Sequence, residues 1–333
     1  MSEAVPPRYD DEFRRRLSRR AFTVIVECVT PPASAPLEGS LAPLVELAER
    51  LKGSDEVHAL TLTDRVRCDV DHDPVAVAPR VAAGSGRMPL VHLAGKGRDR
   101  RSLEPVLARL ATSGLESVLL TTGDPPAPAS APPLDAVEMI RLARALHPAL
   151  HIAAVVSPFH LGDDQRRGEY ARAADKERAG ADVFIAQLGW DMGKVAELAS
   201  WRRDHGLRAP LLLSVALVTA ARARWFASAR LPGVVLTREL ETAVAREQRA
   251  ADGGRAAAYR RLALQIVGAE WLGYAGVLLV GIQDARKIGR VVADVDRLRG
   301  ELGTEDAWWS AWQTALGGRD GAGRGRERAH GQE

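Results

Sequence analysis

Short apolar runs alternate with amphipathic segments from about residue 22 to residue 298. The runs are rich in Val, Ile and Leu, which is typical of strands buried on both faces of a parallel sheet. Eight such runs occur, at Phe22–Val29, Val57–Thr63, Met88–Leu93, Ser117–Thr121, Ile152–Ser157, Asp182–Gln187, Pro210–Ala216 and Gly276–Gly281. Helical spacing of hydrophobic residues marks the segments between them, among them Leu41–Leu51, Leu103–Thr112, Ala136–Leu146, Asp164–Ala179 and Met192–His205. Eight strands separated by helices predict an α/β protein with a (β/α)8 TIM-barrel fold.

The segment after the first predicted strand argues against the competing architecture, a doubly wound open sheet. That fold would need a glycine-rich turn at this point. The first strand instead runs into Thr30, Pro31 and Pro32. The segment Thr237–Gly273 is longer than one barrel unit needs. We therefore expect an extra helix before the eighth strand.

Both ends of the chain extend beyond the predicted barrel, which we place at residues 21–300. Residues 1–20 are polar and are expected to form an N-terminal arm. Trp308, Trp309 and Trp312 have helical spacing, so residues 301–316 are predicted to form a terminal helix whose tryptophans pack on the barrel. An exposed tryptophan patch that binds a partner is the alternative. Residues 317–333 are rich in Gly, Arg and Glu and are expected to be disordered.

Composition and charge narrow the class of protein. Of the 333 residues, 46% are hydrophobic and 27% are charged, as in an ordinary globular protein, and the net charge of +3 is too small to indicate nucleic-acid binding. The longest apolar stretch, Leu262–Ile282, is not expected to span a membrane, because it contains Gln265 and Glu270. Cys28 and Cys68 form neither a disulfide framework nor a metal-ligand spacing, and no secretory signal is apparent. We therefore expect a cytoplasmic protein without a metal, a membrane or a nucleic-acid partner, and a homo-oligomer stays open.

Polar residues stand at the carboxyl ends of six consecutive predicted strands, which is where barrels of this class build their active sites. They are Glu27, Thr63 with Asp64, His92, Thr122-Gly123-Asp124, Ser157 with His160, and Gln187. Each has a structural explanation when taken alone. Glu27 could pair with a buried arginine, and Thr122–Pro126 is a good tight turn. In a barrel, however, all of these side chains point into one mouth.

The predicted helix around residues 165–179 carries a second group of charged residues. Glu169, Arg172 and Lys176 lie along one of its faces. An arginine and a lysine on one face near the barrel mouth could hold a phosphate or diphosphate group. The alternative is a solvated face on which Glu169 pairs with Arg172.

Taken together, these residues resemble the methylenetetrahydrofolate reductase family, flavin-dependent (β/α) barrels that reduce a folate-bound one-carbon unit. The resemblance covers about residues 22–281. It is strongest in Thr122–Pro126, in His92 followed by Asp99 and Arg100, in Gly180-Ala181-Asp182 leading to Gln187, and in Glu27 followed by Pro31-Pro32.

The resemblance implies a role for each matching position. Glu27 resembles the family's general acid, Asp124 the aspartate beside flavin and pterin, and Gln187 a pterin-binding amide. The positions that it assigns to flavin binding are Thr63, His92, Thr122, Asp124, Ala154, His160, Glu169, Arg172 and Lys176. A glutamate in an apolar barrel suits the role of acid, because burial disfavours its charged form and raises its pKa.

These roles imply an oxidoreductase that interconverts 5,10-methylenetetrahydrofolate and 5-methyltetrahydrofolate through bound FAD, with NADH or NADPH as partner. Three flavin contacts depart from the family pattern, because Thr122, Val156 and Asp175 replace an arginine, a tyrosine and an arginine. These departures leave open a folate reductase that takes hydride directly from NAD(P)H. The terminal tryptophans and the arginine-rich tail leave open a second alternative, an accessory folate- or flavin-binding barrel of a methyl-transfer assembly.

Overall fold

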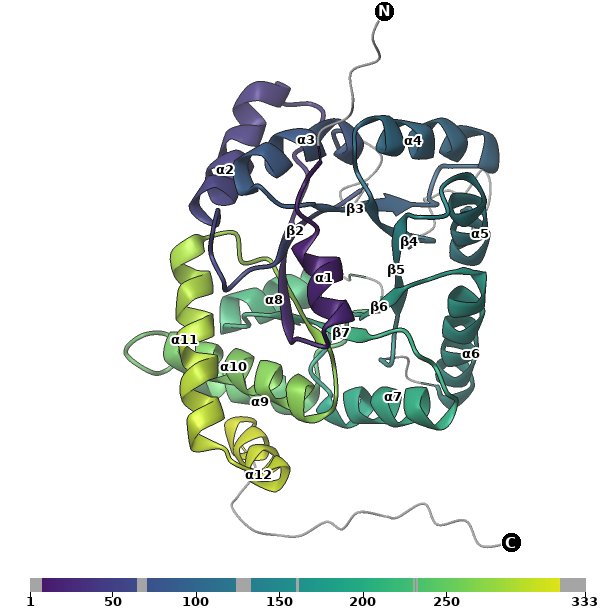
Figure 1. Ribbon diagram of the computed structural model, residues 1–333. Coiled ribbons are helices and arrows are strands. Elements are labelled where there is room, and N and C mark those ends of the chain that lie inside the picture. The colour runs from purple at the N-terminus through teal and green to yellow at the C-terminus, as the bar shows by residue number, and fades with distance from the viewer. Residues whose placement is uncertain are drawn as a thin grey trace, which may run out of the picture.

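The eight strands close into a barrel in which β1 to β8 follow one another in chain order, and all neighbours are parallel (Figure 1). This computed structural model describes residues 8–64, 71–123, 133–159, 162–229, 231 and 233–317. The (β/α)8 barrel expected from the sequence is confirmed. Every strand begins within two residues of its predicted position. The strands are β1 Thr23–Cys28, β2 Ala59–Leu62, β3 Leu90–Ala94, β4 Ser117–Thr121, β5 His151–Val156, β6 Val183–Ala186, β7 Leu211–Ala216 and β8 Gly276–Val280.

Helices surround the barrel, and each strand leads into a helix that covers its outer side (Figure 1). These outer helices are α2 Leu37–Arg50, α3 Pro74–Ser85, α4 Arg100–Thr112, α5 Ala136–Leu146, α6 Asp163–Ala179, α7 Met192–Asp204, α10 Arg255–Trp271 and α11 Ala285–Glu301. An extra helix was expected before β8. The structure has two there, α8 (Ala220–Ala229) and α9 (Arg238–Glu247). No helix of the described residues is both long enough and apolar enough to cross a membrane.

Alternation along β1 shows how the strands direct their side chains. Ile25 belongs to the small cluster that fills the barrel, whereas Val26 and Cys28 belong to the large cluster between barrel and helices. Because successive side chains of a strand point to opposite faces, Glu27 must share the inner face with Ile25. The same alternation places Leu90, Leu119, Ala153, Ile185, Leu212 and Leu278 inside the barrel.

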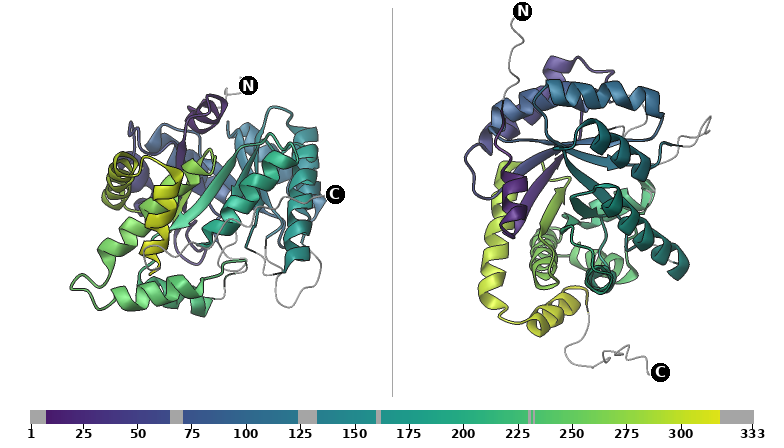
Figure 2. Two further views of the ribbon diagram at one scale, coloured as in Figure 1. Left: turned by 90° about the horizontal axis from the view of Figure 1, so that it is seen from below. Right: turned by 45° about the vertical axis from the view of Figure 1, so that its right-hand side comes forward.

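A short helix, α1 (Glu12–Ser18), closes the end of the barrel at which the strands begin (Figure 2). Its Phe13 is 1% exposed and packs with the residues that fill the barrel. Asp11 caps the helix by accepting a hydrogen bond from the backbone N–H of Arg14 at 3.0 Å. Part of the polar N-terminal arm is therefore a packed helix, and α1 lies at the opposite end from α8 and α9.

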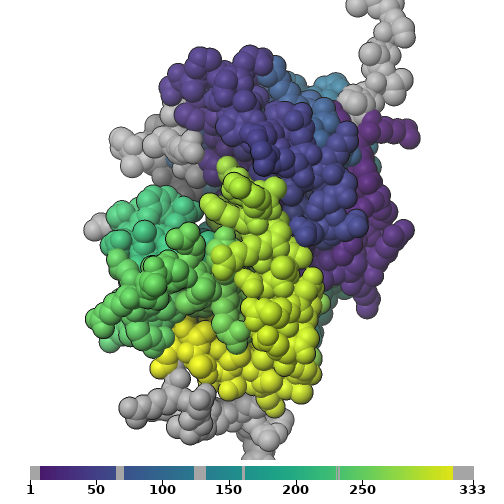
Figure 3. Space-filling model, turned by 90° about the vertical axis from the view of Figure 1, so that its left-hand side faces the viewer, coloured from purple at the N-terminus to yellow at the C-terminus, as the bar shows by residue number. Residues whose placement is uncertain are grey.

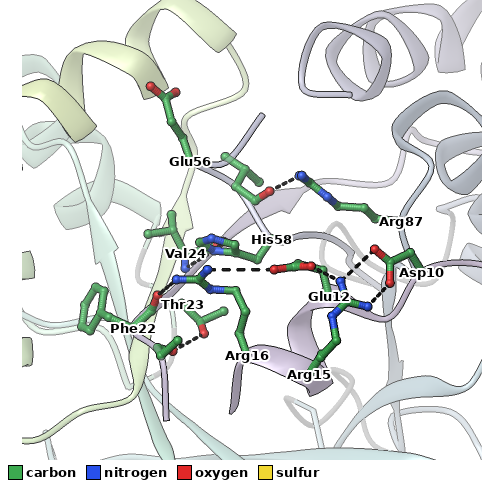
Figure 4. A network of polar contacts seen from close by, with 12 residues as sticks. Asp10, Glu12, Arg15, Arg16, Phe22, Thr23, Val24, Glu56, His58 and Arg87 are labelled. Atoms are coloured by element: carbon green, nitrogen blue, oxygen red, sulfur yellow. Dashed lines mark hydrogen bonds and ion pairs between the residues drawn. The ribbon is translucent and has the colours of Figure 1, made fainter. Parts of the chain in front are cut away.

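Ion pairs and hydrogen bonds surround α1 and join it to the start of β1 (Figure 4). Arg15 pairs with Asp10 and Glu12 within its own segment, and Arg16 donates to the carbonyl oxygen of Phe22, just before β1, at 2.8 Å. Close by, Nδ1 of His58 accepts a hydrogen bond from the backbone N–H of Val24 at 2.9 Å. Burial lowers the pKa of His58 to about 4, and the positive charge of Arg16 acts in the same direction.

His58 is expected to make the protein less stable as the pH falls from about 6.5 to 4. Over this range the unfolded chain binds a proton that the folded protein excludes, so the free energy of unfolding decreases. From pH 7 to pH 5 the contribution of His58 is about 2 kcal/mol. We expect urea unfolding of His58→Asn to show a loss smaller by this amount, because asparagine accepts the same hydrogen bond without titrating. His205→Asn, at an exposed histidine, is the control, and an equal loss in both variants would contradict the prediction.

The terminal helix α12 (Glu305–Ala315) packs against α10 and ends the described chain below α11 (Figure 3). Trp308 is fully buried, and its indole N–H donates to the carbonyl oxygen of Leu264 at 2.7 Å. A Cβ on Gly268 would lie 2.0 Å from the Trp308 ring, so the contact requires glycine on α10. Trp312 is buried as well. These two tryptophans are therefore part of the fold and not of an exposed patch.

Candidate active site

A cavity of about 700 Å³ opens at the carboxyl ends of the strands. It collects side chains from widely separated parts of the sequence. Glu27 comes from β1, Thr63 follows β2, His92 comes from β3, and Gln187 follows β6. The structure thus brings together the predicted acid, the predicted amide and two of the predicted flavin contacts.

Glu27 lies on the inner face of β1, and its side chain lines this cavity. Burial raises the pKa of Glu27 to about 7, and the positive charge of Arg222 acts in the opposite direction. A carboxyl group with a pKa near 7 exchanges its proton readily at neutral pH. Glu27 is therefore suited to act as an acid or a base on a molecule in the cavity.

His92 also faces the cavity, although it stands in the middle of β3 (Leu90–Ala94) and not at its end as predicted. Its Nε2 atom is buried and has no hydrogen-bond partner among the described residues. Burial lowers the pKa of His92 to about 4, so the imidazole is neutral at pH 7. An unpartnered ring nitrogen at a cavity wall can bind a polar atom of a ligand.

The residues after β2 are held in place by their own contacts. The Thr63 hydroxyl accepts a hydrogen bond from the backbone N–H of Thr30 at 3.1 Å. Asp64 forms a buried ion pair with Arg98 and accepts a hydrogen bond from the backbone N–H of Ala94 at 2.8 Å. The pair places no net charge in the cavity, and it fixes the loops after β2 and β3 relative to each other.

Gln187 lines both this cavity and a smaller one of about 300 Å³ beside it. Its side-chain oxygen accepts a hydrogen bond from the backbone N–H of Leu188 at 2.9 Å, so the orientation of the amide is set. Thr121, Gly123 and Val155 also border both cavities. The two cavities are therefore neighbouring parts of one mouth.

The smaller cavity contains four of the predicted cofactor contacts: Thr122, Glu169, Arg172 and Lys176. The Thr122 hydroxyl accepts a hydrogen bond from the backbone N–H of Ala136 at 3.1 Å. Lys176 is buried, donates to the carbonyl oxygen of Val155 at 2.8 Å and lies 3.3 Å from a Glu169 oxygen.

The cations of α6 are thus already paired. Arg172 forms an ion pair with Asp135 at the start of α5. The alternative of a solvated helix face predicted a pair between Arg172 and Glu169 instead. Together with Lys176 and Glu169, the observed pair gives two cations and two carboxylates around the smaller cavity. Their charges compensate within the chain.

One predicted site residue does not join this group, and two others are not among the residues that the structure describes. Ala154 is fully buried between barrel and helices, because its neighbours Ala153 and Val155 face the barrel interior, and its side chain lines neither cavity. Asp124 and His160 lie outside the described residues. Their assignments stay predictions.

The sequence analysis did not predict that residues of α8 belong to the site. Arg222, Trp225 and Phe226 line the main cavity from this helix. Arg222 lies over both aromatic rings, with its guanidinium carbon 4.6 Å and 5.2 Å from their centres. An arginine and two aromatic residues shortly after the seventh strand are a signal that could have been used, because that strand also ends at the barrel mouth.

A (β/α)8 barrel that gathers a titratable glutamate, a neutral histidine and an amide around one cavity at the carboxyl ends of its strands has the arrangement typical of an enzyme active site. The chain belongs to the methylenetetrahydrofolate reductase family, whose sequence model matches residues 12–253. This membership indicates a folate-related oxidoreductase. No curated protein matches the sequence.

Two solved structures show a similar fold. One is an uncharacterised protein from Clostridium thermocellum that binds two copies of 5-methyl-5,6,7,8-tetrahydrofolic acid. It is 13% identical, covers 87% of this chain and 99% of its own, and has a TM-score of 0.65. The other is 2,3-dimethylmalate lyase, of the PEP mutase/isocitrate lyase superfamily, which is 12% identical and covers 89% of this chain and 87% of its own, with a TM-score of 0.50. At these identities both likenesses concern the fold alone.

Proposed function

We propose that the protein interconverts 5,10-methylenetetrahydrofolate and 5-methyltetrahydrofolate, with Glu27 as the proton donor. The observation that carries the proposal is the position of Glu27, a carboxyl group with a raised pKa inside the main cavity. The family assignment supports it. So does the similarly folded Clostridium protein, which binds the methylated folate.

In the reducing direction, Glu27 gives its proton to the nitrogen that leaves the five-membered ring of the folate. The bond between this nitrogen and the methylene carbon breaks, and an iminium ion forms on the other nitrogen. A hydride then adds to the methylene carbon and gives the methyl group, so one proton and one hydride are taken up. Gln187 binds and orients the pterin through its amide, and the apolar barrel wall excludes water from the iminium ion.

The main cavity fits the ring end of a flavin, because His92, whose buried Nε2 has no partner among the described residues, is part of its wall. When bound, FAD would take hydride from NAD(P)H and deliver it to the folate. The described residues that would hold it are Thr63, His92, Thr122, Glu169, Arg172 and Lys176.

Direct transfer from NAD(P)H to the folate is the second candidate, and the pairing on α6 favours it. Lys176 and Arg172 would bind a flavin diphosphate best if their charges were uncompensated. Glu169 and Asp135 already compensate them. One of the two features behind the accessory-barrel alternative, the terminal tryptophans, no longer supports it, since Trp308 and Trp312 are buried within the chain.

The visible spectrum of the purified protein distinguishes these candidates. We expect a yellow protein whose flavin absorption bleaches when 5-methyltetrahydrofolate is added without oxygen. A colourless protein that oxidises NADH only when methylenetetrahydrofolate is present would establish the direct route. A protein that binds no added flavin and turns over no folate would contradict the proposed function.

A further inference from the structure

Arg222 is held in the main cavity by aromatic rings, and no carboxylate of the described residues pairs with it. Its guanidinium lies over the faces of Trp225 and Phe226, which attract a cation. The turn after β8 also comes close to Arg222. A Cβ on Gly281 would come within 2.4 Å of Nη2 of Arg222, so this turn leaves space for the guanidinium because residue 281 is glycine. The cation is therefore fixed in position.

The charge of Arg222 acts on Glu27. In the described chain, the other titratable groups that line the cavity are Asp64, His92 and Lys96. Asp64 is neutralised by its ion pair with Arg98, and His92 is uncharged at pH 7. Of the two cations at the cavity, Lys96 and Arg222, it is Arg222 whose charge acts on the Glu27 carboxyl. Burial is the main influence on the Glu27 carboxyl, and Arg222 opposes it by favouring the charged form.

The proposed reaction creates a charge at this place. When Glu27 donates its proton, the O–H bond breaks and a carboxylate remains inside the barrel. An isolated carboxylate in such surroundings is costly, and a nearby fixed cation offsets the cost. Arginine suits this task because its guanidinium keeps its charge throughout the pH range of the reaction.

We propose that Arg222 is a positioning residue that stabilises the carboxylate form of Glu27 and so sets the pH range in which Glu27 gives up its proton. The inference rests on the proposed function. It concerns a residue of α8, outside the groups that the sequence assigned to the site.

A direct titration of Glu27 tests the proposal without any turnover. The carbonyl stretch of protonated Glu27 is followed by infrared difference spectroscopy, and its absence from Glu27→Gln identifies it. In Arg222→Gln the titration midpoint is expected to rise by about one pH unit, because the cation that favours the carboxylate is gone. Arg222→Lys keeps the charge and is expected to stay closer to the native midpoint. Arg224→Gln, at an exposed arginine of the same helix, should leave it unchanged.

An unchanged midpoint in Arg222→Gln overturns the proposal, whether or not the protein reduces folate. If this variant does not fold, Trp225→Leu provides the same test, since Trp225 is 46% exposed and its ring holds the guanidinium. A smaller upward shift is then expected, and no shift overturns the proposal.

Kinetics separate this role from simple substrate binding. In Arg222→Gln the alkaline limb of the pH–rate profile should move upward and kcat should fall about threefold to tenfold, because Glu27 becomes a weaker acid. KM should change little. A raised KM with an unchanged profile would show that Arg222 anchors an anionic group of a substrate, which contradicts the proposal. Absence of turnover in the native protein would contradict the proposed function, while the infrared titration would still decide the role of Arg222.

Discussion

Glu27→Gln is expected to lower kcat for the reduction of methylenetetrahydrofolate by about a hundredfold to ten-thousandfold, which is the usual contribution of a positioned acid. Glutamine keeps the size and polarity of the side chain but has no proton to donate. In the native protein the rate should also decline above about pH 7, where Glu27 loses its proton. The measurement is steady-state turnover over a range of pH, together with the affinity for folate from a binding titration.

Glu56→Gln is the matched control for this substitution. Glu56 is an exposed glutamate that precedes β2, at the opposite end of the barrel from the cavity. It should leave kcat, KM and the pH profile as they are. If Glu27→Gln kept more than roughly a tenth of the native kcat, Glu27 would not be the proton donor.

Phe13→Ala is expected to have the largest effect on stability. It should lower the free energy of unfolding by about 3–5 kcal/mol, because the ring is fully buried and its removal opens a cavity at the closed end of the barrel. The ring also packs against His151, with the two ring centres 5.4 Å apart. Urea unfolding followed by circular dichroism measures this loss.

Arg14→Ala is the control for this prediction, because Arg14 is exposed on the same helix. It should change the free energy of unfolding by no more than about 0.5 kcal/mol. Below the transition, kcat and KM of Phe13→Ala should match those of the native protein, since α1 lies at the end away from the cavity. A loss of less than about 1 kcal/mol would mean that α1 does not close the barrel.

The barrel could be predicted because its strands are short, apolar and separated by helices, and this pattern depends on local sequence alone. The direction in which an individual side chain points could not be predicted from this pattern. In β5, whose sequence is His-Ile-Ala-Ala-Val-Val, either alanine could face inward, and the structure turns Ala153 inward and Ala154 outward. A difference of one residue decides which side chain can touch a ligand.

The helix α1 was not predicted because half of residues 1–20 are charged. Its signal was nevertheless present, in Phe13 and Leu17 one helical turn apart and in Asp11 as an N-cap. The sequence after the seventh strand could suggest that Arg222 reaches the barrel mouth, but the exact placement of its guanidinium could not be predicted. It depends on how α8 folds back over the barrel mouth, which is set by contacts between distant segments.

The contact between Trp308 and Gly268 has a consequence for evolution and for engineering. Any side chain at position 268 would overlap the indole ring, so a larger residue there is compatible only with a smaller one at position 308. These two positions should therefore covary among relatives that retain this terminal helix. Truncation before residue 305 would expose to water the face of α10 that packs against α12. Shortened versions of the chain should therefore aggregate.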